Sequence, residues 1–327
     1  MGFRVGIIGA GTMGQVHSRA WHRMPDIELI GVYDIDATRA SRIAADSGVT
    51  AFSSFEELVN TVDIVDVCVP TPFHAEYAIF ALEADKDVVC EKPMGRTLEE
   101  CDRMIAAAEA SGKTLMPAQV LRFFPEFQST HDLIRKGAIG APAVVRTHRG
   151  GGFPRGVNNW FADFAQSGGV SLDILIHDFD WLRWTLGDVE RVYAKTRHTD
   201  GIHEDDYVLA TLRFKSGAIA HVEGTWMDAA GYYTSIEAAG DNGLIHYDSR
   251  ETAPLRVARR RHDSSSGAGI HSESPVSADP YYLELRHFVD CLTAGVAPMI
   301  TPEDGRAAVA IGLAALESSR IGKIVSL

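Results

Sequence analysis

The chain has 327 residues, 46% of them hydrophobic and 23% charged, which suits two ordinary domains with a sizeable core each. Its formal net charge of -13 argues against a nucleic-acid or anionic-membrane surface, because phosphate binding needs clustered cations. A basic run at residues 259–262 leads into a serine-rich stretch and indicates the solvated edge of a loop.

The cysteines are widely separated and lie mostly in apolar patterns, without the C-x-x-C spacing of a metal or redox site. They are Cys68, Cys90, Cys101 and Cys291. This usage predicts reduced core residues of a cytoplasmic protein. An apolar strand pattern follows Met1 almost at once, so we expect no signal peptide, and no apolar run approaches membrane-spanning length.

The start of the chain predicts a short buried strand that ends in a glycine-rich turn before a helix. Gly9, Gly11 and Gly14 have the G-x-G-x-x-G spacing that lets a dinucleotide pyrophosphate approach the backbone. The N–H groups near Thr12 and Met13 would then face the phosphates. Three glycines after a strand can also form a plain turn, so this fingerprint needs a second feature.

The second apolar segment, residues 28–33, supplies that feature because it ends in Asp34, twenty residues beyond Gly14. A carboxylate at this position accepts hydrogen bonds from the adenosine ribose. Asp34 and Asp36 would repel a ribose phosphate, so the sequence predicts NAD rather than NADP. Arg39 lies close enough to soften that preference.

Helix-like and strand-like segments alternate up to about residue 120, as in the βα units of a parallel sheet. The predicted elements are a helix at 37–47, Ser/Glu and Thr/Glu capping boxes at 54–57 and 97–100, and strands at 64–69, 87–90 and 114–120. Ligands bind beyond the carboxyl ends of such strands. The residues that follow the strands are therefore the first candidates for function.

A stiff turn with two prolines follows the strand at 64–69. We expect Thr71, Pro72 and His74 to lie near the nicotinamide side of the cofactor. His74 could instead be a helix-capping histidine.

The strand at 87–90 is followed by Glu91, Lys92 and Pro93. Pro93 keeps Lys92 out of the helical region, so the lysine is presented at a strand end on a rigid backbone, beside the predicted cofactor site. Glu91 balances its charge. The alternative is an ordinary surface lysine.

We place the domain boundary near residue 120, with a doubly wound Rossmann domain over 1–120 and an α+β domain over 121–327 whose C-terminal helices close back. The second domain is predicted to hold a large, open, mostly antiparallel sheet. Its elements are helices at 125–135, 280–292 and 302–319, strands at 142–148, 189–197, 206–214, 218–226, 232–239 and 244–247, and hairpin turns at 215–217 and 240–243.

Asp173 and His177 are four residues apart, so on one helix they share a face. His177 can exchange a proton with a substrate hydroxyl near neutral pH while Asp173 binds and orients the substrate. The pair could also be structural, or half of a metal site with Asp178, Asp180 or His148. The spacing does not demand a metal, and we predict none.

These motifs resemble the glucose-fructose oxidoreductase/inositol dehydrogenase/rhizopine catabolism (Gfo/Idh/MocA) family along essentially the whole chain. The matching residues are the glycine fingerprint at 9–14, Asp34, the turn at 71–74, the Glu-Lys-Pro motif at 91–93, and Gly168-Gly169 leading to Asp173 and His177. The resemblance implies a Rossmann domain and a second domain whose open sheet builds a homodimer or homotetramer. It also implies a catalytic set of Lys92, Asp173 and His177 in a cleft between the domains.

The resemblance further implies hydride transfer between NAD and a secondary alcohol of an inositol, sugar or related polyol. Expected cofactor contacts are Gly9, Gly11, Thr12, Met13, Gly14, Asp34, Arg39, Thr71, Pro72, His74, Glu91 and Lys92. Arg122, Asn158 and Trp160 are expected substrate contacts; inositol dehydrogenases look similar in the placement of the first two, while the surrounding loop departs from theirs. We expect a small-molecule partner and neither nucleic acid nor membrane.

Our mechanistic hypothesis gives His177 the hydroxyl proton and Lys92 the stabilisation of the developing alkoxide. Two alternatives remain at this level. One is an NAD-using glycosidase with transient redox, and the other is a non-enzymatic dinucleotide or sugar sensor of the same fold. Retention of Lys92, Asp173 and His177 weighs against the sensor.

Overall fold

The computed structural model describes residues 2–154, 156–197, 206–229, 231–251, 255–259, 269–273 and 279–327. Most of the basic run at 259–262 lies outside these residues. By contacts, the described chain forms two compact units. The first unit spans Met1–Val120, Gly156–Trp160 and Ala278–Val309, and the second spans Leu121–Arg155, Phe161–Ser277 and Ala310–Leu327.

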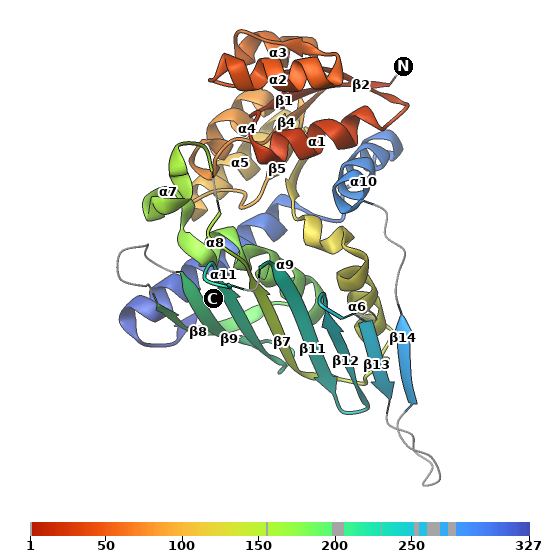
Figure 1. The fold of residues 1–327 in the computed structure, drawn as a ribbon, viewed down its shortest axis with the longest axis vertical. Coiled ribbons are helices and arrows are strands. Elements are labelled where there is room, and N and C mark those ends of the chain that lie inside the picture. The colour runs from red at the N-terminus through yellow and green to blue at the C-terminus, as the bar shows by residue number, and fades with distance from the viewer. Residues whose placement is uncertain are drawn as a thin grey trace. The chain divides into compact units, whose positions relative to one another are not determined.

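The first unit holds a six-stranded parallel sheet in the order β3-β2-β1-β4-β5-β6 (Figure 1). Its strands are β1 (Phe3–Ile8), β2 (Ile27–Tyr33), β3 (Thr50–Ala51), β4 (Ile64–Val67), β5 (Asp87–Glu91) and β6 (Leu115–Ala118). The strands are short and apolar, and β1 and β4 are buried along most of their length. This confirms the predicted Rossmann architecture.

The helices of this unit are α1 (Thr12–His22), α2 (Ala37–Ser47), α3 (Phe55–Thr61), the 3-10 turn η1 (Thr71–Phe73), α4 (His74–Glu83), α5 (Leu98–Ser111) and α10 (Pro280–Ala294). Both bonds of the predicted capping box are present at the start of α5, between Thr97 and Glu100. Helix α10, one of the predicted closing helices, packs on α1. Its Arg286 donates over 2.6 Å to Asp26, which lies between α1 and β2.

The second unit holds a nine-stranded sheet in the order β14-β13-β12-β11-β7-β10-β9-β8-β15. Its strands are β7 (Pro142–Gly150), β8 (Val189–Arg197), β9 (Tyr207–Phe214), β10 (Ile219–Thr225), β11 (Tyr233–Gly240), β12 (Gly243–Asp248), β13 (Leu255–Arg259), β14 (Gly269–Glu273) and β15 (Val325–Ser326). β7 and β10 pair in parallel, and the other described pairs are antiparallel. The predicted mostly antiparallel sheet is confirmed, and β13, β14 and β15 extend it.

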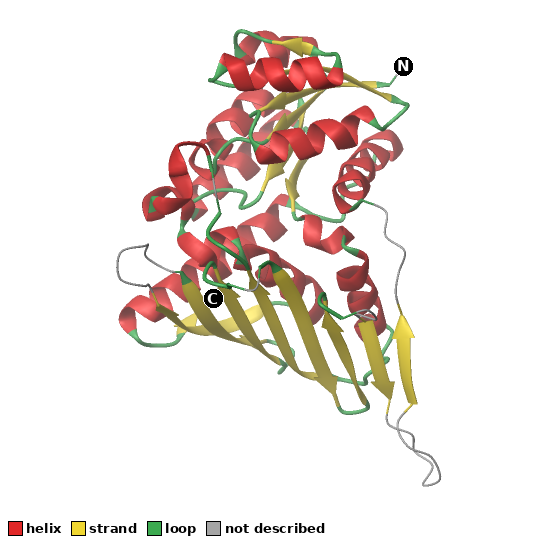
Figure 2. Ribbon diagram, in the orientation of Figure 1, coloured by secondary structure: helices red, strands yellow, loops and turns green. Residues whose placement is uncertain are grey.

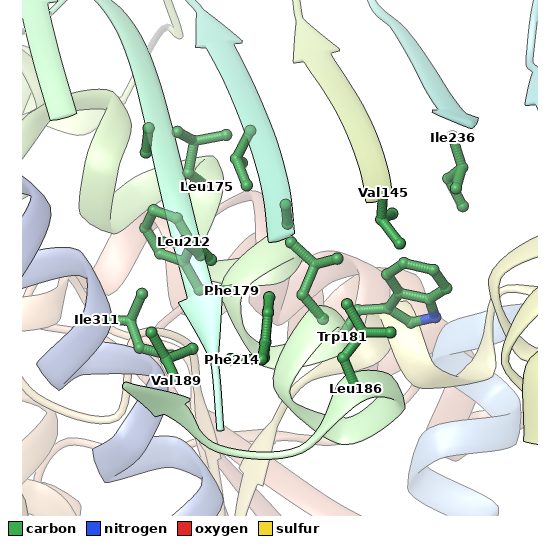
Figure 3. Packing of buried hydrophobic residues seen from close by; sticks show 14 of the residues in the cluster. Val145, Leu175, Phe179, Trp181, Leu186, Val189, Leu212, Phe214, Ile236 and Ile311 are labelled. Atoms are coloured by element: carbon green, nitrogen blue, oxygen red, sulfur yellow. The ribbon is translucent and has the colours of Figure 1, made fainter. Parts of the chain in front are cut away.

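The remaining helical segments are η2 (Val120–Phe123), α6 (Pro125–Arg135), η3 (Val157–Ala162), α7 (Phe164–Ser167), α8 (Gly169–Asp173), α9 (Leu175–Leu186) and α11 (Pro302–Ile321). Helix α9 is apolar on most of its surface and packs against the sheet of the second unit (Figures 1 and 2). Figure 3 shows Phe179 and Trp181 of α9 among Val145, Leu212 and Phe214 of the strands. The indole N–H of Trp181 is satisfied by the Phe127 carbonyl at 3.0 Å.

No helix within the described ranges is both long enough and apolar enough to cross a membrane.

The packing of α9 predicts a large stability loss when its buried ring is removed. Phe179 is fully buried, so Phe179→Ala should lower the free energy of unfolding by about 3–5 kcal/mol. Ile324→Ala is the control, because that side chain is 57% exposed and its loss should change stability by less than about 0.5 kcal/mol. Urea denaturation followed by circular dichroism measures both, and equal midpoints for the two variants would contradict this account of the core.

Candidate active site

The glycine-rich turn after β1 has the geometry that the fingerprint predicts. Gly9 has a φ of +106°, which favours glycine, and its N–H donates to the Tyr33 carbonyl over 2.8 Å. A Cβ on Gly14 would lie 1.9 Å from the Gly9 carbonyl oxygen, so only glycine lets α1 approach β1 this closely. At Gly11, by contrast, no described atom lies within 4 Å of an added Cβ. The backbone there is open to a ligand.

Helix α1 begins directly at this turn, with Gly11 at its N-cap. Its first turn contains Thr12 and Met13 and has no acidic side chain, so the positive end of the helix dipole is not neutralised by its own residues. Thr12 is exposed and Met13 half-buried. A helix start of this kind suits a pyrophosphate.

Asp34 follows β2 and ties its end to the glycine turn. One carboxylate oxygen accepts the Ala10 N–H over 2.7 Å, and the other accepts the Asp36 N–H over 2.8 Å. The Arg39 guanidinium donates to Asp34 over 2.6 Å and to Asp36 over 3.1 Å. The open backbone at the turn, the unneutralised helix start and this oriented carboxylate fit the pyrophosphate and ribose of NAD.

His74 lies at the start of α4 and is buried. Its Nδ1 is 2.8 Å from the Pro93 carbonyl and its Nε2 is 2.8 Å from the Val69 carbonyl. Burial lowers its pKa despite these two bonds. His74 therefore ties the segment after β4 to the segment after β5. Its direct contact with the cofactor stays a prediction, as does that of the buried Thr71 and the half-buried Pro72.

Lys92 follows the last residue of β5 and is half-buried. The preceding Glu91 is buried, and its carboxylate accepts the Lys92 N–H over 2.9 Å. The Lys92–Pro93 peptide bond is cis. The lysine is therefore presented from the carboxyl edge of the parallel sheet, on a segment whose main chain is bonded through Glu91 on one side and through Pro93 on the other.

The second unit carries Asp173 and His177, and the structure corrects their local geometry. Asp173 is the last residue of α8 and His177 lies in the first turn of α9, with the break at Ile174. The two residues therefore belong to two consecutive helices rather than one, α8 of five residues and α9 of twelve. Gly168 and Gly169 precede them with φ of +71° and +67°, a left-handed conformation that explains the glycine pair. Both side chains are half-buried.

Two buried ion pairs hold α9 within three residues after His177. Asp178 accepts from Arg149 Nε over 2.5 Å, and Asp180 accepts from Arg122 over 2.8 and 2.6 Å. Burial opposes the Arg149 charge, but the Asp178 carboxylate raises its pKa above the usual range. The sequence offered Asp178 and Asp180 only as optional metal ligands and did not find these partners, which come from distant segments.

Arg122 is 1% exposed in this pair, and its guanidinium lies 5.3 Å from the centre of the Trp184 ring. Its role as a substrate contact stays a prediction. His148, the third optional ligand, stacks on Tyr233 with ring centres 4.3 Å apart.

Asn158 and Trp160 lie in η3 and cluster with the first unit, although the sequence boundary assigned them to the second domain. Asn158 is exposed and has a φ of +53°, a conformation that asparagine tolerates better than most residues. Trp160 is half-buried.

A family model described as an oxidoreductase family with an NAD-binding Rossmann fold matches residues 3–119, and the Gfo/Idh/MocA C-terminal domain model matches residues 127–246. The chain belongs to the Gfo/Idh/MocA family. It is an NAD-binding oxidoreductase and a dehydrogenase, as the sequence predicts, and its cofactor is NAD.

Two curated relatives cover nearly the whole chain. The myo-inositol 2-dehydrogenase of Thermotoga maritima is 31% identical over 99% of this chain and 98% of its own length. Inositol 2-dehydrogenase 3 of Saccharopolyspora erythraea is 31% identical over 99% of this chain and 95% of its own length. Among solved structures, levoglucosan dehydrogenase with NADH and levoglucosan has a TM-score of 0.92 over 100% of this chain and 99% of its own, at 24% identity, which supports the fold.

Two of the three glycines in the turn, Gly14 and Gly11, predict different outcomes on substitution. Gly14→Ala forces a Cβ against the Gly9 carbonyl and should destabilise the protein by about 1–3 kcal/mol. Gly11→Ala has room in the protein, so its melting temperature without ligand should match the parent, while the methyl obstructs the pyrophosphate and weakens NADH binding. Melting curves and NADH fluorescence titrations measure both. A Gly11→Ala protein that binds NADH normally would contradict this placement of the pyrophosphate.

Asp34 predicts the choice between NAD and NADP. Asp34→Ala removes the ribose acceptor and releases Arg39, so the dissociation constant for NADH should rise about tenfold or more while NADPH binding improves. Asp36→Asn is the matched control, because it removes a nearby charge but leaves Asp34 bonded to Ala10. An unchanged ratio of NADH to NADPH affinity in Asp34→Ala would refute the assignment.

Proposed function

We propose that this enzyme oxidises a secondary alcohol of an inositol, sugar or related polyol, or reduces the matching ketone. The observation that carries the proposal is the half-buried Lys92, fixed at the carboxyl end of β5 in the unit that holds the glycine turn. Relatives named as inositol 2-dehydrogenases at 31% identity over nearly the full chain support the same substrate class.

NAD, when bound, supplies the acceptor for the hydride that leaves the carbinol carbon. In our proposal the Lys92 ammonium donates a hydrogen bond to the substrate oxygen and stabilises its developing negative charge. His177 takes the hydroxyl proton, so the carbinol becomes a ketone and the imidazole an imidazolium. Asp173 binds a neighbouring hydroxyl and orients His177. In the reverse direction His177 returns the proton to the alkoxide.

Further substrate contacts are proposed for Arg122, Asn158 and Trp160. Asn158 is supported by its exposed amide and Trp160 by its half-buried indole, which suits the apolar face of a sugar ring. Arg122 is supported only by the resemblance, since its guanidinium is bonded to Asp180.

We also propose that residues 1–120 form the NAD domain and that residues 121–327 bind substrate and form a homodimer or homotetramer through their sheet. Strand β9 supports the interface, because Val208, Ala210 and Leu212 face the core while Leu209 is 45% exposed on the other face. Tyr193 on β8 is likewise 39% exposed. A cytoplasmic location is supported by the four cysteines, which are free thiols.

Lys92→Ala and His177→Ala should each lower turnover by about 100-fold or more, because they remove charge stabilisation and proton transfer. The measurement follows reduced-nicotinamide absorbance with NAD and a panel of inositols, sugars and sugar acids. Lys215→Ala is the control, since that side chain is 65% exposed on a hairpin and should leave turnover unchanged.

Three outcomes separate the alternatives. Activity that persists in Lys92→Ala would refute its catalytic role. Release of an aglycone from a glycoside without net NAD reduction would make the protein a glycosidase. Tight NADH binding with no reaction on any substrate would make it a sensor.

A further inference from the structure

A cluster of buried ionisable side chains lies within the first unit, on the side of the sheet covered by α1. His17 comes from α1, Asp66 from β4 and Glu91 from β5. Their exposed fractions are 0%, 0% and 5%. Buried charges persist in proteins when they are paired. The charged members of this cluster must therefore be paired with one another.

The geometry places a carboxylate against each nitrogen of the His17 ring. Nδ1 lies 2.9 and 3.1 Å from the two Asp66 oxygens. Nε2 lies 3.3 Å from Glu91 Oε1, a charge contact rather than an aligned hydrogen bond. A neutral imidazole carries one N–H, whereas an imidazolium carries two. The imidazolium is therefore the form that suits both carboxylates.

Other groups around the cluster agree with this state. The Trp21 indole donates to Asp66 over 2.7 Å, and the Cys68 thiol lies 3.4 Å from both Asp66 and His17. The Tyr281 ring of α10 lies 6.1 Å from the His17 ring. Burial lowers the pKa of His17, but Asp66 and Cys68 together outweigh burial and hold this pKa well above its usual value. Burial raises the pKa of Cys68, so its sulfur stays protonated.

His17, Asp66 and Cys68 form the one group in the described part of the chain whose spacing could suit a metal ion. Their chemistry does not fit one. Structural zinc normally takes four ligands, whereas this group offers three, and Asp66 already accepts from His17 and Trp21.

The cluster reaches the catalytic segment through Glu91. One oxygen of its carboxylate faces His17, and the other accepts the main-chain N–H of Lys92 over 2.9 Å. We propose that His17, as an imidazolium between Asp66 and Glu91, is a positioning residue for Lys92. The proposal rests on the catalytic role proposed for Lys92 and goes beyond it by naming what orients the lysine.

Loss of the His17 cation has a specific consequence. Glu91 would be left as a buried carboxylate without that neighbouring charge. The contact that holds its Oε1 is then lost, and the carboxylate can rotate away from the Lys92 N–H. Misplacement of a catalytic group by about 1 Å can lower a rate about 100-fold. A merely structural histidine would lower stability without moving the Lys92 side chain.

Kinetics test the positioning role. His17→Gln should lower kcat about 10- to 100-fold and change the NADH dissociation constant by less than about threefold. His22→Gln is the matched control, because His22 is exposed on the same helix. Glu91→Gln keeps an acceptor for the Lys92 N–H but removes the charge that faces His17, so it should also lower kcat. If His17→Gln does not fold, Glu91→Gln tests the same contact between His17 and Glu91.

Two spectroscopic measurements on the full chain do not depend on turnover. In ¹⁵N-histidine spectra, the signal lost in His17→Gln should report both ring nitrogens protonated at pH 8. The ¹³Cε signal of Lys92, identified by Lys92→Ala, should shift in His17→Gln and Glu91→Gln but not in His22→Gln. Either a neutral His17 at pH 8, or an unmoved Lys92 signal together with normal kcat in folded His17→Gln, overturns the proposal. A parent enzyme inactive on every polyol would instead overturn the proposed function.

Discussion

The close approach of α1 to β1 is the constraint on which the first unit depends. Because Gly14 has no Cβ, the helix can lie against the carbonyl of Gly9, and its N-terminus opens at the carboxyl edge of the sheet. The same approach brings the second turn of α1 over β4, where His17 meets Asp66. One small residue thus allows both an anion-binding helix start and a buried ionic contact beneath it.

Buried ion pairs recur around the residues proposed to perform the chemistry. In the first unit, Glu91 connects His17 to the main chain of Lys92. In the second unit, Asp178 and Asp180 follow His177 on α9. Each of these two carboxylates is paired with an arginine from another segment. Such pairs contribute less to net stability than apolar packing, but breaking one is strongly destabilising, so they favour a single side-chain arrangement. Preorganisation of this kind is what a proton-transfer site requires.

Much of the fold could be predicted because its signals are local. Apolar runs, capping residues and glycine-containing turns placed most strands and helices within two residues of their observed ends, such as α2 and β8. The two predicted hairpin turns connect β9 to β10 and β11 to β12. The break at Ile174 was not predicted, because Asp173 and His177 have helical spacing on either side of it and no proline or glycine marks it.

The sequence by itself determined the Rossmann unit, the antiparallel second sheet, the NAD-binding fingerprint and the candidate residues Lys92, Asp173 and His177, because each is encoded over a few neighbouring positions. Only the tertiary structure decided which buried charged side chains pair with one another. Asp66 is 49 residues from His17, and Asp180 is 58 residues from Arg122. Chain separation of this size leaves no periodic trace in a single sequence. Pairing across it arises when packed elements bring buried charges within reach, and burial then makes that pairing obligatory.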